Sequence, residues 1–428
     1  MGVTERLAEF AVAPVSGEAA LAMMRLSLLD WASCGIAGRG EPVARILRGM
    51  ALAEGGAGQA SVIGWGVKVP ARAAALVNGA TSHALDYDDT HFGHIGHPSV
   101  AVVPAALAVA EQTGADGAAF LSACLVGVEV SIRVGMWLGR AHYQTGFHQT
   151  GTAGAFGAVA GAGRLLGLDA GQMAQALGLV STRASGLKSQ FGTMGKPYNA
   201  GIAAASGVEA VLLAKAGFVS NPRGLETAQG FGATHAGEGR GEALDGLGDT
   251  WRLETVSHKF HACCHGTHAA LEALGTLDVA PEVVDGVEIT VHPRWLSVCD
   301  IAAPTTGLEA KFSYRLTAAM VLAGRDTGAL ETFSDAACGE PGLVALRDRV
   351  RVVADEAVPE TAARVMVRAA GRVLEAGHDL DAPISLDARA AKVGAKARAL
   401  LGDERAGRVA AAVAAGNIGA LAAELAAG

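Results

Sequence analysis

The chain has 428 residues, of which half are hydrophobic and only 5% aromatic, and it contains 58 glycines. This length exceeds the size at which one hydrophobic core usually stops growing, so we expect two domains. A net charge of −8 argues against a nucleic-acid-binding protein, which needs a basic face.

The N-terminus and the cysteines bear on the cellular compartment. The first residues, MGVTERLAEFAV, are charged and amphipathic, which predicts no signal peptide. The longest apolar runs, such as SVAVVPAALAVA, are short for a membrane span and contain proline. Six cysteines do not form a disulfide framework, and adjacent Cys263 and Cys264 are typical of reduced thiols. We therefore expect a soluble, cytoplasmic enzyme.

Long apolar segments separated by Gly, Pro, Asp or Ser dominate the chain from about residue 17 to residue 255. Their length and low content of β-branched residues predict helices. Several are apolar on nearly every face, which predicts burial inside a large helical assembly. The clearest of these predicted helices are 17–38, 71–89, 99–114, 116–139 and 199–218.

The pattern changes after Lys259. Three segments alternate and are richer in Val, Ile and Thr, so they predict strands: 284–293, 350–358 and 363–377. A predicted helix, 312–328, lies between them, and Ala-rich helix returns from Asp387 to the end.

These elements predict a mainly α fold with an insertion. We expect a large all-helical domain made from both chain ends, residues 1–268 and 387–428. A smaller α+β lid domain, residues 269–386, is expected to be inserted between them.

Two short segments hold eight of the 13 histidines. SHALDYDDTHFGHIGHPSV, residues 82–100, has four histidines and three aspartates, and SHKFHACCHGTH, residues 257–268, has four histidines and two cysteines. Such density is typical of a metal site or of an acid/base site.

The spacing of these histidines argues against a metal. His91, His94 and His97 are three residues apart, but glycines and a proline break the helix that would align them. His265 and His268 could chelate, yet neither segment has a known zinc spacing. We predict no metal, and a metal-dependent hydrolase stays as an alternative of a different class.

Four basic residues precede predicted helix starts: His97, His148, Lys196 and Lys259. A helix N-terminus carries partial positive charge, so a cation there is unfavourable unless an anion offsets it. Helix starts are also ready anion sites. The four positions therefore predict a cleft for a polyanion.

Aspartates accompany the first histidine segment. Asp86, Asp88 and Asp89 are close enough in sequence to His97 for an Asp–His pair, which sets a tautomer and tunes a pKa. Abstraction of a hydrogen α to a carboxylate needs a base and cations that stabilise the product anion. Cofactor-independent proton abstraction next to a carboxylate is the chemistry these residues favour.

At these residues the sequence resembles the MmgE/PrpD family, which includes 2-methylcitrate dehydratase, cis-aconitate decarboxylase and iminodisuccinate epimerase. The resemblance rests on HALDYDDTHFGHIGHPS, GFHQTGTAGAFGAVAGAGRLLGL, GTMGKPYNAGIAA, KFHACCHGTHAALEAL and EAKFSYRLTAAM. It implies an all-helical domain and an α+β lid with the active site between them. It also implies no required metal or cofactor, and a homodimer.

The resemblance also implies a set of active-site residues: Asp86, Thr90, His97, His148, Lys196 and Lys259. Two departures accompany it. The decarboxylases have a tyrosine three positions after the A-(R/K)-x-S motif, where this chain has Leu316, with Tyr314 two residues earlier. Arg223, in SNPRGLE, is an additional candidate for binding a carboxylate.

We therefore expect a lyase that removes or adds water at a small di- or tricarboxylate, in the manner of 2-methylcitrate dehydratase. His97, supported by Asp86, would be the general acid/base and His148 its counterpart, with the choice of base left open. The substrate-binding residues would be Thr90, Lys196, Lys259, Arg223 and Tyr314. Epimerisation of a dicarboxylate such as iminodisuccinate, decarboxylation of a cis-aconitate-like acid and a silent binding protein are the alternatives.

Overall fold

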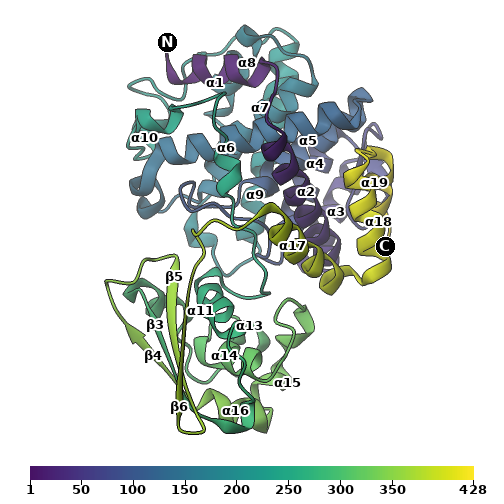
Figure 1. The fold of residues 1–428 in the computed structure, drawn as a ribbon. Helices are drawn as coiled ribbons and strands as arrows, with labels where there is room; N and C mark the ends of the chain where they lie inside the picture. Colours follow the sequence, from purple (N-terminus) through teal and green to yellow (C-terminus); the bar gives the residue numbers. More distant parts are fainter. The chain divides into compact units, whose positions relative to one another are not determined.

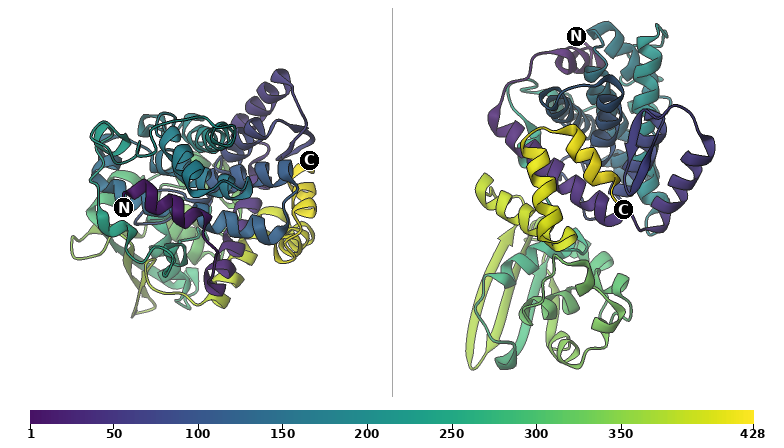
Figure 2. Two further views of the ribbon diagram at one scale, coloured as in Figure 1. Left: turned by 90° about the horizontal axis from the view of Figure 1, so that it is seen from above. Right: turned by 90° about the vertical axis from the view of Figure 1, so that its right-hand side faces the viewer.

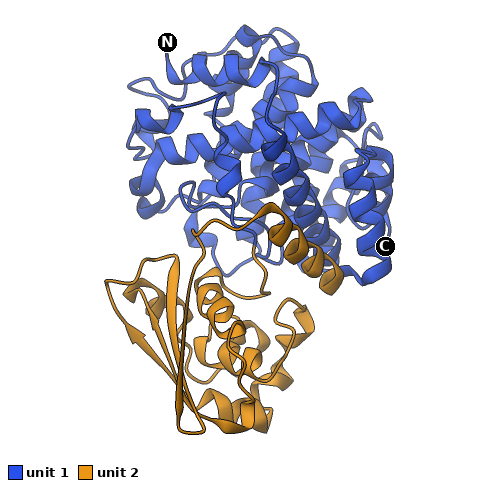
Figure 3. Ribbon diagram, in the orientation of Figure 1, with its two compact units in different colours: residues 1–258, 401–428 blue, residues 259–400 orange.

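The computed structural model describes residues 1–428, and its contacts divide the chain into two compact units (Figure 3). Unit 1 comprises Met1–His258 and Leu401–Gly428, and unit 2 comprises Lys259–Leu400. Unit 2 thus begins earlier and ends later than the domain expected at residues 269–386. The reason is that helix α11 (His265–Gly275) packs on strands of unit 2, and that Lys392 of helix α17 (Leu386–Leu401) pairs with Glu272 of α11.

Unit 1 is helical apart from one β-hairpin (Figure 1). Its helices are α1 (Val3–Val12), α2 (Glu18–Gly38), α3 (Pro42–Glu54), α4 (Ala71–Ser82), α5 (Ser99–Thr113), α6 (Gly117–Thr145), α7 (Gln149–Leu165), α8 (Ala170–Val180), α9 (Gly195–Lys215), α10 (Phe231–Thr234), α18 (Asp403–Ala414) and α19 (Ile418–Ala426). The hairpin consists of β1 (Ala60–Val62) and β2 (Trp65–Val69).

The predicted helices of unit 1 are present, but the one expected at 71–89 ends at Ser82. The residues beyond it form a loop in which Asp88 bonds His83, and Asp89 bonds Ser99. Side chains of this kind compete with the helical backbone for hydrogen bonds, which explains the early end of α4.

Small side chains allow the central helices of unit 1 to approach closely. Helix α7 is buried from Gln149 to Gly163 and packs on α5, α6 and α9. Where α4 crosses α9, a Cβ on Gly79 would lie only 2.9 Å from the Cα of Gly201, so glycine is required there. This explains the abundance of Gly and Ala in the sequence.

Helices α2 and α6 are long and apolar enough to cross a membrane by length and composition. However, 72% and 83% of their most apolar windows are buried inside the protein, as in core helices. The C-terminal helices α18 and α19 pack on α2 (Figure 2, yellow beside purple), so the two ends of the chain share one core.

Unit 2 contains a four-stranded sheet with the order β4-β3-β5-β6. Strand β3 (Val284–Val291) is parallel to β4 (Val350–Ala354) and antiparallel to β5 (Ala362–Ala369), which is antiparallel to β6 (Arg372–Asp379). Buried and accessible residues alternate along β5, as expected of a strand with one covered face. The covering helices include α11 and α14 (Tyr314–Leu322), and the shorter ones are α12 (Leu296–Cys299), α13 (Gly307–Ala310), α15 (Asp335–Cys338) and α16 (Pro341–Arg347).

Candidate active site

The loop between α4 and α5 carries the first histidine segment. Two of its residues, Asp86 (φ +51°) and Ile95 (φ +56°), adopt the left-handed backbone region, which is rare for residues other than glycine and costs most for a β-branched one. Such strain persists only where surrounding contacts enforce it. The loop is therefore held in one specific shape.

Asp88 lies at the centre of this loop and is fully buried. Its Oδ1 is 2.9 Å from Nδ1 of His83, and its Oδ2 is 2.8 Å from Nδ1 of His97. The rings of His83 and His97 meet edge to face with centroids 4.5 Å apart. One carboxylate thus contacts two imidazoles.

Asp86 and Lys196 extend this chain of charges on the other side of His97. Asp86 Oδ1 is 3.2 Å from His97 Nε2 and 2.6 Å from Lys196 Nζ. Imidazoles and the Lys196 ammonium thus alternate with carboxylates from His83 to Lys196, and His97 lies between two carboxylates. Asp86 is the accessible member, with 42% of its side chain exposed.

His148 is the residue that immediately precedes α7, and its ring stacks on that of His83 with centroids 5.9 Å apart. Asn199 places its Nδ2 3.1 Å from Nδ1 of His148 and also donates to the carbonyl of Leu187. An amide nitrogen only donates, so Nδ1 of His148 accepts, and the proton of the neutral ring lies on Nε2. Phe191 covers this ring edge to face at 4.9 Å.

Burial and neighbouring charges set the ionisation of the cluster. Burial alone would raise the pKa of Asp88, but His83 and His97 hold that pKa well below its usual value. Burial lowers the pKa of His83, and it lowers the pKa of His148 well below the usual value, with His83 and Lys196 adding to the effect. The cluster thus combines an anionic Asp88 with neutral His83 and His148 at neutral pH.

Asp89 has different partners from Asp88. It accepts a hydrogen bond from the Ser99 hydroxyl at 2.5 Å. Burial, with the charge of Asp30, raises the pKa of Asp89 to about 7. Ser27 links Asp89 to His258, whose Nε2 lies 3.1 Å from the Ser27 hydroxyl. These residues form a second buried polar cluster that does not include His97.

Thr90 joins the two histidine segments within unit 1. Its backbone pairs with that of Ser257 through two hydrogen bonds of 2.8 and 2.7 Å. The Thr90 hydroxyl also donates to the Ser257 carbonyl at 3.2 Å. Lys259 follows Ser257 by two residues and is the first residue of unit 2, where it acts electrostatically on Cys263 and His268.

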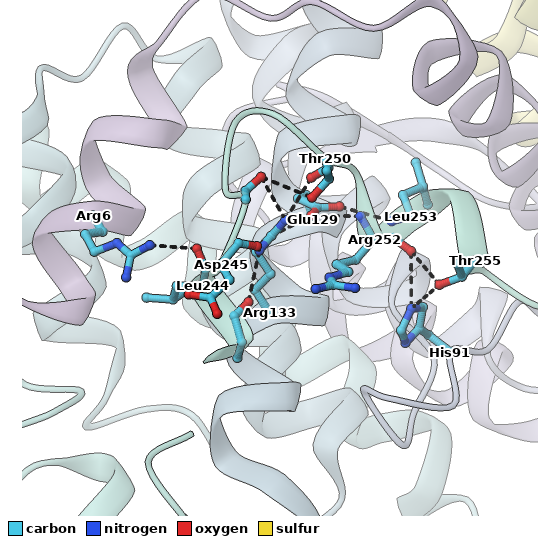
Figure 4. Close-up of polar contacts among 12 residues, drawn as sticks. Arg6, His91, Glu129, Arg133, Leu244, Asp245, Thr250, Arg252, Leu253 and Thr255 are labelled. Carbon is cyan, nitrogen blue, oxygen red and sulfur yellow. Dashed lines mark hydrogen bonds and ion pairs between the residues drawn. The ribbon is translucent and has the colours of Figure 1, made fainter. Parts of the chain in front are cut away.

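A buried ion pair on α6 holds the segment that leads to Ser257 (Figure 4). Arg133 Nε is 2.6 Å from Glu129, and Glu129 accepts hydrogen bonds from the backbone amides of Arg252 and Leu253. The Arg133 guanidinium donates to four further carbonyls of this segment, those of Ala243, Asp245, Gly246 and Thr250. Hydrogen bonds to the buried Glu129–Arg133 pair thus hold this segment in place.

Histidines that sequence spacing grouped together point in different directions. His91 contacts the Thr255 hydroxyl and the Arg252 carbonyl (Figure 4), and His94 contacts Ser131. Candidate donor atoms of His83, Asp86, Asp88 and His97 do lie within 4.8 Å of one another. However, the Lys196 ammonium pairs with Asp86 and both imidazoles contact Asp88, an arrangement that suits acid/base chemistry.

The predicted relation of basic residues to helix starts holds for two of the four. His148 immediately precedes α7, and His97 is separated from α5 by one proline. Lys196 lies inside the first turn of α9. For Lys259 the prediction was wrong, because α11 begins only at His265, after the turn through Cys263 and Cys264.

Arg223 and Tyr314 have other surroundings within their own units. Arg223 lies in a surface pocket of about 360 Å³ between α1 and α8, with Glu5 and Glu9 nearby. Tyr314 is buried in unit 2 and donates a hydrogen bond of 2.6 Å to the carbonyl of Gly266. Leu316 is likewise fully buried. The expected substrate contact by Arg223 is therefore corrected, and the Tyr314 hydroxyl is already engaged.

Two members of the cluster, His83 and Asn199, were absent from the prediction, and Asp88 was named only as a candidate for the Asp–His pair that it forms with His97. His83 and Asp88 stand in the first histidine segment, so their proximity in sequence was the available signal. Asn199 had none, because its contact with His148 joins positions 51 residues apart.

Comparison with known proteins gives two family-model matches and several curated relatives. The MmgE/PrpD N-terminal domain matches residues 5–242, and the MmgE/PrpD C-terminal domain matches residues 261–415.

The chain is 31% identical over 267 residues to a cis-aconitate decarboxylase-like protein, oryM, of Aspergillus oryzae, covering 58% of this chain and 55% of that protein. It is 33% identical over 235 residues to cis-aconitate decarboxylase of Aspergillus terreus, covering 51% and 48%. The human cis-aconitate decarboxylase is 34% identical over 180 residues, covering 40% and 37%. The aligned segments thus span about half the length of these relatives or less.

Proposed function

This chain belongs to the MmgE/PrpD family, and we propose that it is a lyase that removes water from, or adds water to, a small di- or tricarboxylate. The observation that carries the proposal is the chain of contacts in which His83, His97 and Lys196 alternate with the carboxylates of Asp88 and Asp86. It combines acid/base groups and a cation within one cluster, and proton abstraction next to a carboxylate requires both.

In the proposed reaction His97 is the base. Nδ1 of His97 lies 2.8 Å from the carboxylate of Asp88, so Nε2 is the nitrogen proposed to exchange a proton on the side of Asp86 and Lys196. When a substrate carboxylate pairs with Lys196 and displaces Asp86 from Nε2, this nitrogen takes the hydrogen α to the carboxylate.

His148 is the proposed acid, because its Nε2 carries the proton of the neutral ring. As the C–H bond breaks, its electron pair forms the C=C bond, and the hydroxyl on the neighbouring carbon leaves. The proton from His148 Nε2 joins this hydroxyl, so the products are an unsaturated acid and water. Addition of water follows the same steps in reverse.

Lys196 and Lys259 are the proposed contacts for substrate carboxylates. Lys196 already binds one carboxylate, that of Asp86, so an incoming carboxylate replaces an existing partner. Thr90 and Ser257 hold each other's backbone, and Lys259 follows two residues later in the chain. We assign Thr90 the role of orienting the substrate.

A second candidate is decarboxylation of a cis-aconitate-like acid. It is favoured by the names of the relatives, which are cis-aconitate decarboxylases. It is disfavoured by buried Leu316 at the position where the decarboxylases have tyrosine, and by the hydrogen bond between Tyr314 and Gly266.

Proton NMR in heavy water, with citrate-, aconitate- and aspartate-derived acids, separates these reactions. Dehydration of a saturated hydroxy acid produces a new vinyl signal, decarboxylation gives an acid with one carboxylate fewer and its own C–H signals, and epimerisation exchanges the α hydrogen without a net change in the skeleton. We expect dehydration or hydration of at least one hydroxy acid. No exchange, elimination or decarboxylation with any of these acids would contradict the proposal.

Lys196→Met tests the role of the cation on the acid that proves to be the substrate. We expect kcat/KM to fall by about 10³-fold, as when a group that stabilises a developing anion is removed. Lys215→Met is the matched control, since Lys215 is an exposed residue in the last turn of the same helix. It should leave kcat/KM within about threefold of the original value. Equal losses of kcat/KM in both variants would contradict the proposed contact between Lys196 and a substrate carboxylate.

A further inference from the structure

We propose that Asp88 and His83 are positioning residues for this reaction, with Asp88 orienting His97 and His83 holding Asp88 in place. The inference rests on the proposed function, in which His97 is the base. Neither residue touches the substrate in this scheme, and each acts through its neighbour.

The geometry of Asp88 leaves it one orientation. Each carboxylate oxygen has its own histidine, with Oδ1 2.9 Å from Nδ1 of His83 and Oδ2 2.8 Å from Nδ1 of His97. Both Asp88 and the His83 side chain are fully buried, so water does not replace either contact. Rotation of the carboxylate would break both contacts at once.

This orientation determines which nitrogen of His97 does chemistry. An ionised carboxylate only accepts hydrogen bonds, so Nδ1 of His97 carries a proton toward Asp88. The other nitrogen, Nε2, is thereby left to exchange a proton on the accessible side, where Asp86 and Lys196 lie. Asp88 also stabilises the imidazolium that forms when His97 accepts the substrate proton.

His83 completes the arrangement because a buried carboxylate needs more than one partner. With Nδ1 donating to Asp88, the neutral His83 ring leaves Nε2 as an acceptor, and Nε2 is buried without a hydrogen-bond partner. Its ring also packs against His97 at 4.5 Å and against His148 at 5.9 Å. His83 thus fixes the carboxylate and separates the two proposed catalytic rings.

Asp89 provides an internal comparison. It is the next residue, it is equally buried, and it is also an aspartate, but its partner is Ser99 and not a histidine. Because its pKa is raised to about 7, an uncharged asparagine resembles the form that Asp89 itself adopts near neutral pH. Substitution at Asp89 therefore reports the cost of changing this buried loop without touching His97.

The experiment compares Asp88→Asn with Asp89→Asn on the acid identified by NMR. We expect Asp88→Asn to lower kcat by about 100-fold with KM within about threefold, because substrate contacts remain while the oriented base is lost. Asp88→Asn removes the anion that stabilises a protonated His97, so the acidic limb of the pH profile should move to lower pH. Asp89→Asn should retain kcat within about threefold and keep the limb in place.

His83→Gln and the double variant with Asp88→Asn test whether His83 acts through Asp88. We expect a loss of about tenfold in kcat for His83→Gln alone. If His83 works only through Asp88, the double variant should be no slower than Asp88→Asn, since effects within one unit are not additive. Multiplication of the two losses would overturn the proposed role of His83.

A readout that does not depend on turnover separates this inference from the proposed function. The ¹⁵N shifts of the His97 ring should show a proton on Nδ1 in the original protein and a changed Nδ1 signal in Asp88→Asn. Identical ring signals in both proteins, or equal losses of kcat in Asp88→Asn and Asp89→Asn, would overturn the inference. A protein inactive on every acid tested would contradict the proposed function while the NMR comparison still decides the orientation of His97.

Discussion

The two histidine-rich segments look alike in sequence but differ in structure. In residues 82–100, His83 and His97 converge on Asp88, and Asp86 connects the cluster to a lysine. In residues 257–268, the rings of His261, His265 and His268 pack edge to face at 4.9 to 5.0 Å and share no carboxylate of their own segment.

The partners of the second segment show what its histidines do instead. His261 Nδ1 lies 2.7 Å from the Thr327 hydroxyl, and His268 Nε2 lies 3.3 Å from the Cys263 carbonyl. The carboxylate of Glu272 in α11 is 3.5 Å from Nε2 of His261 and also pairs with Lys392. The first segment differs because a fully buried carboxylate of its own, Asp88, contacts two of its histidines.

Substitution of one histidine from each segment is the strongest test of this difference. His97→Gln should lower kcat by about 10³-fold, because it removes the proposed base together with its contacts to two carboxylates. His265→Gln, at the first residue of α11, should change kcat by less than about threefold. Steady-state kinetics on the same acid provide the measurement. Comparable losses of kcat in both variants would show that the two segments do not differ in function.

Glu129→Gln tests how firmly the segment before the second histidine cluster is held. It leaves the buried Arg133 without its anion and weakens the contacts to Arg252 and Leu253. Breaking a buried pair costs about 3–5 kcal/mol, so we expect a loss of that order in the free energy of unfolding by urea. Glu404→Gln removes one of the two carboxylate partners of Arg408 at an exposed site and should cost less than about 1 kcal/mol. A loss below about 1 kcal/mol for Glu129→Gln would show that the ion pair does not hold this segment.

Two groups, His91 in the first segment and Glu272 beside the second, should contribute to stability in different pH ranges. Burial lowers the pKa of His91 from 6.5 to about 4, so between these values the unfolded chain binds more protons than the folded protein. The free energy of unfolding should therefore fall as the pH drops from 6.5 to 4, by about 3 kcal/mol for His91 alone. His91→Asn should flatten this decrease.

Glu272, beside the second segment, behaves differently. Although burial would raise its pKa, His261 and Lys392 lower that pKa from 4.5 to about 2. Its contribution is complete above pH 4.5 and is lost as the pH falls toward 2. Urea unfolding at pH 7, 5.5, 4 and 3 measures both ranges, and a constant free energy of unfolding from pH 7 to pH 4 would contradict the account of His91.

Much of the fold was predictable from the sequence because the signals are local. Apolar runs of helical length identified α2, α5, α6 and α9, and alternation in Val-rich segments identified the strand-forming regions of unit 2. The segment expected as one strand at 363–377 instead forms two antiparallel strands, β5 and β6. A long apolar run indicates a helix that is buried on all faces, and alternation indicates a strand that is buried on one face. The end of α4 was missed because aspartate side chains in the following loop bind neighbours that the helical pattern does not reveal.

The sequence by itself determined the helical and sheet-forming stretches and, by resemblance, the residues Asp86, His97, His148 and Lys196. Only the tertiary structure decided that these four lie together, that Asp88 contacts both His83 and His97, and that Arg223 lies elsewhere beside α1. The physical reason is that helix and strand patterns arise from neighbours along the chain. The cluster instead depends on contacts such as that of His148 with Asn199, between elements far apart in sequence.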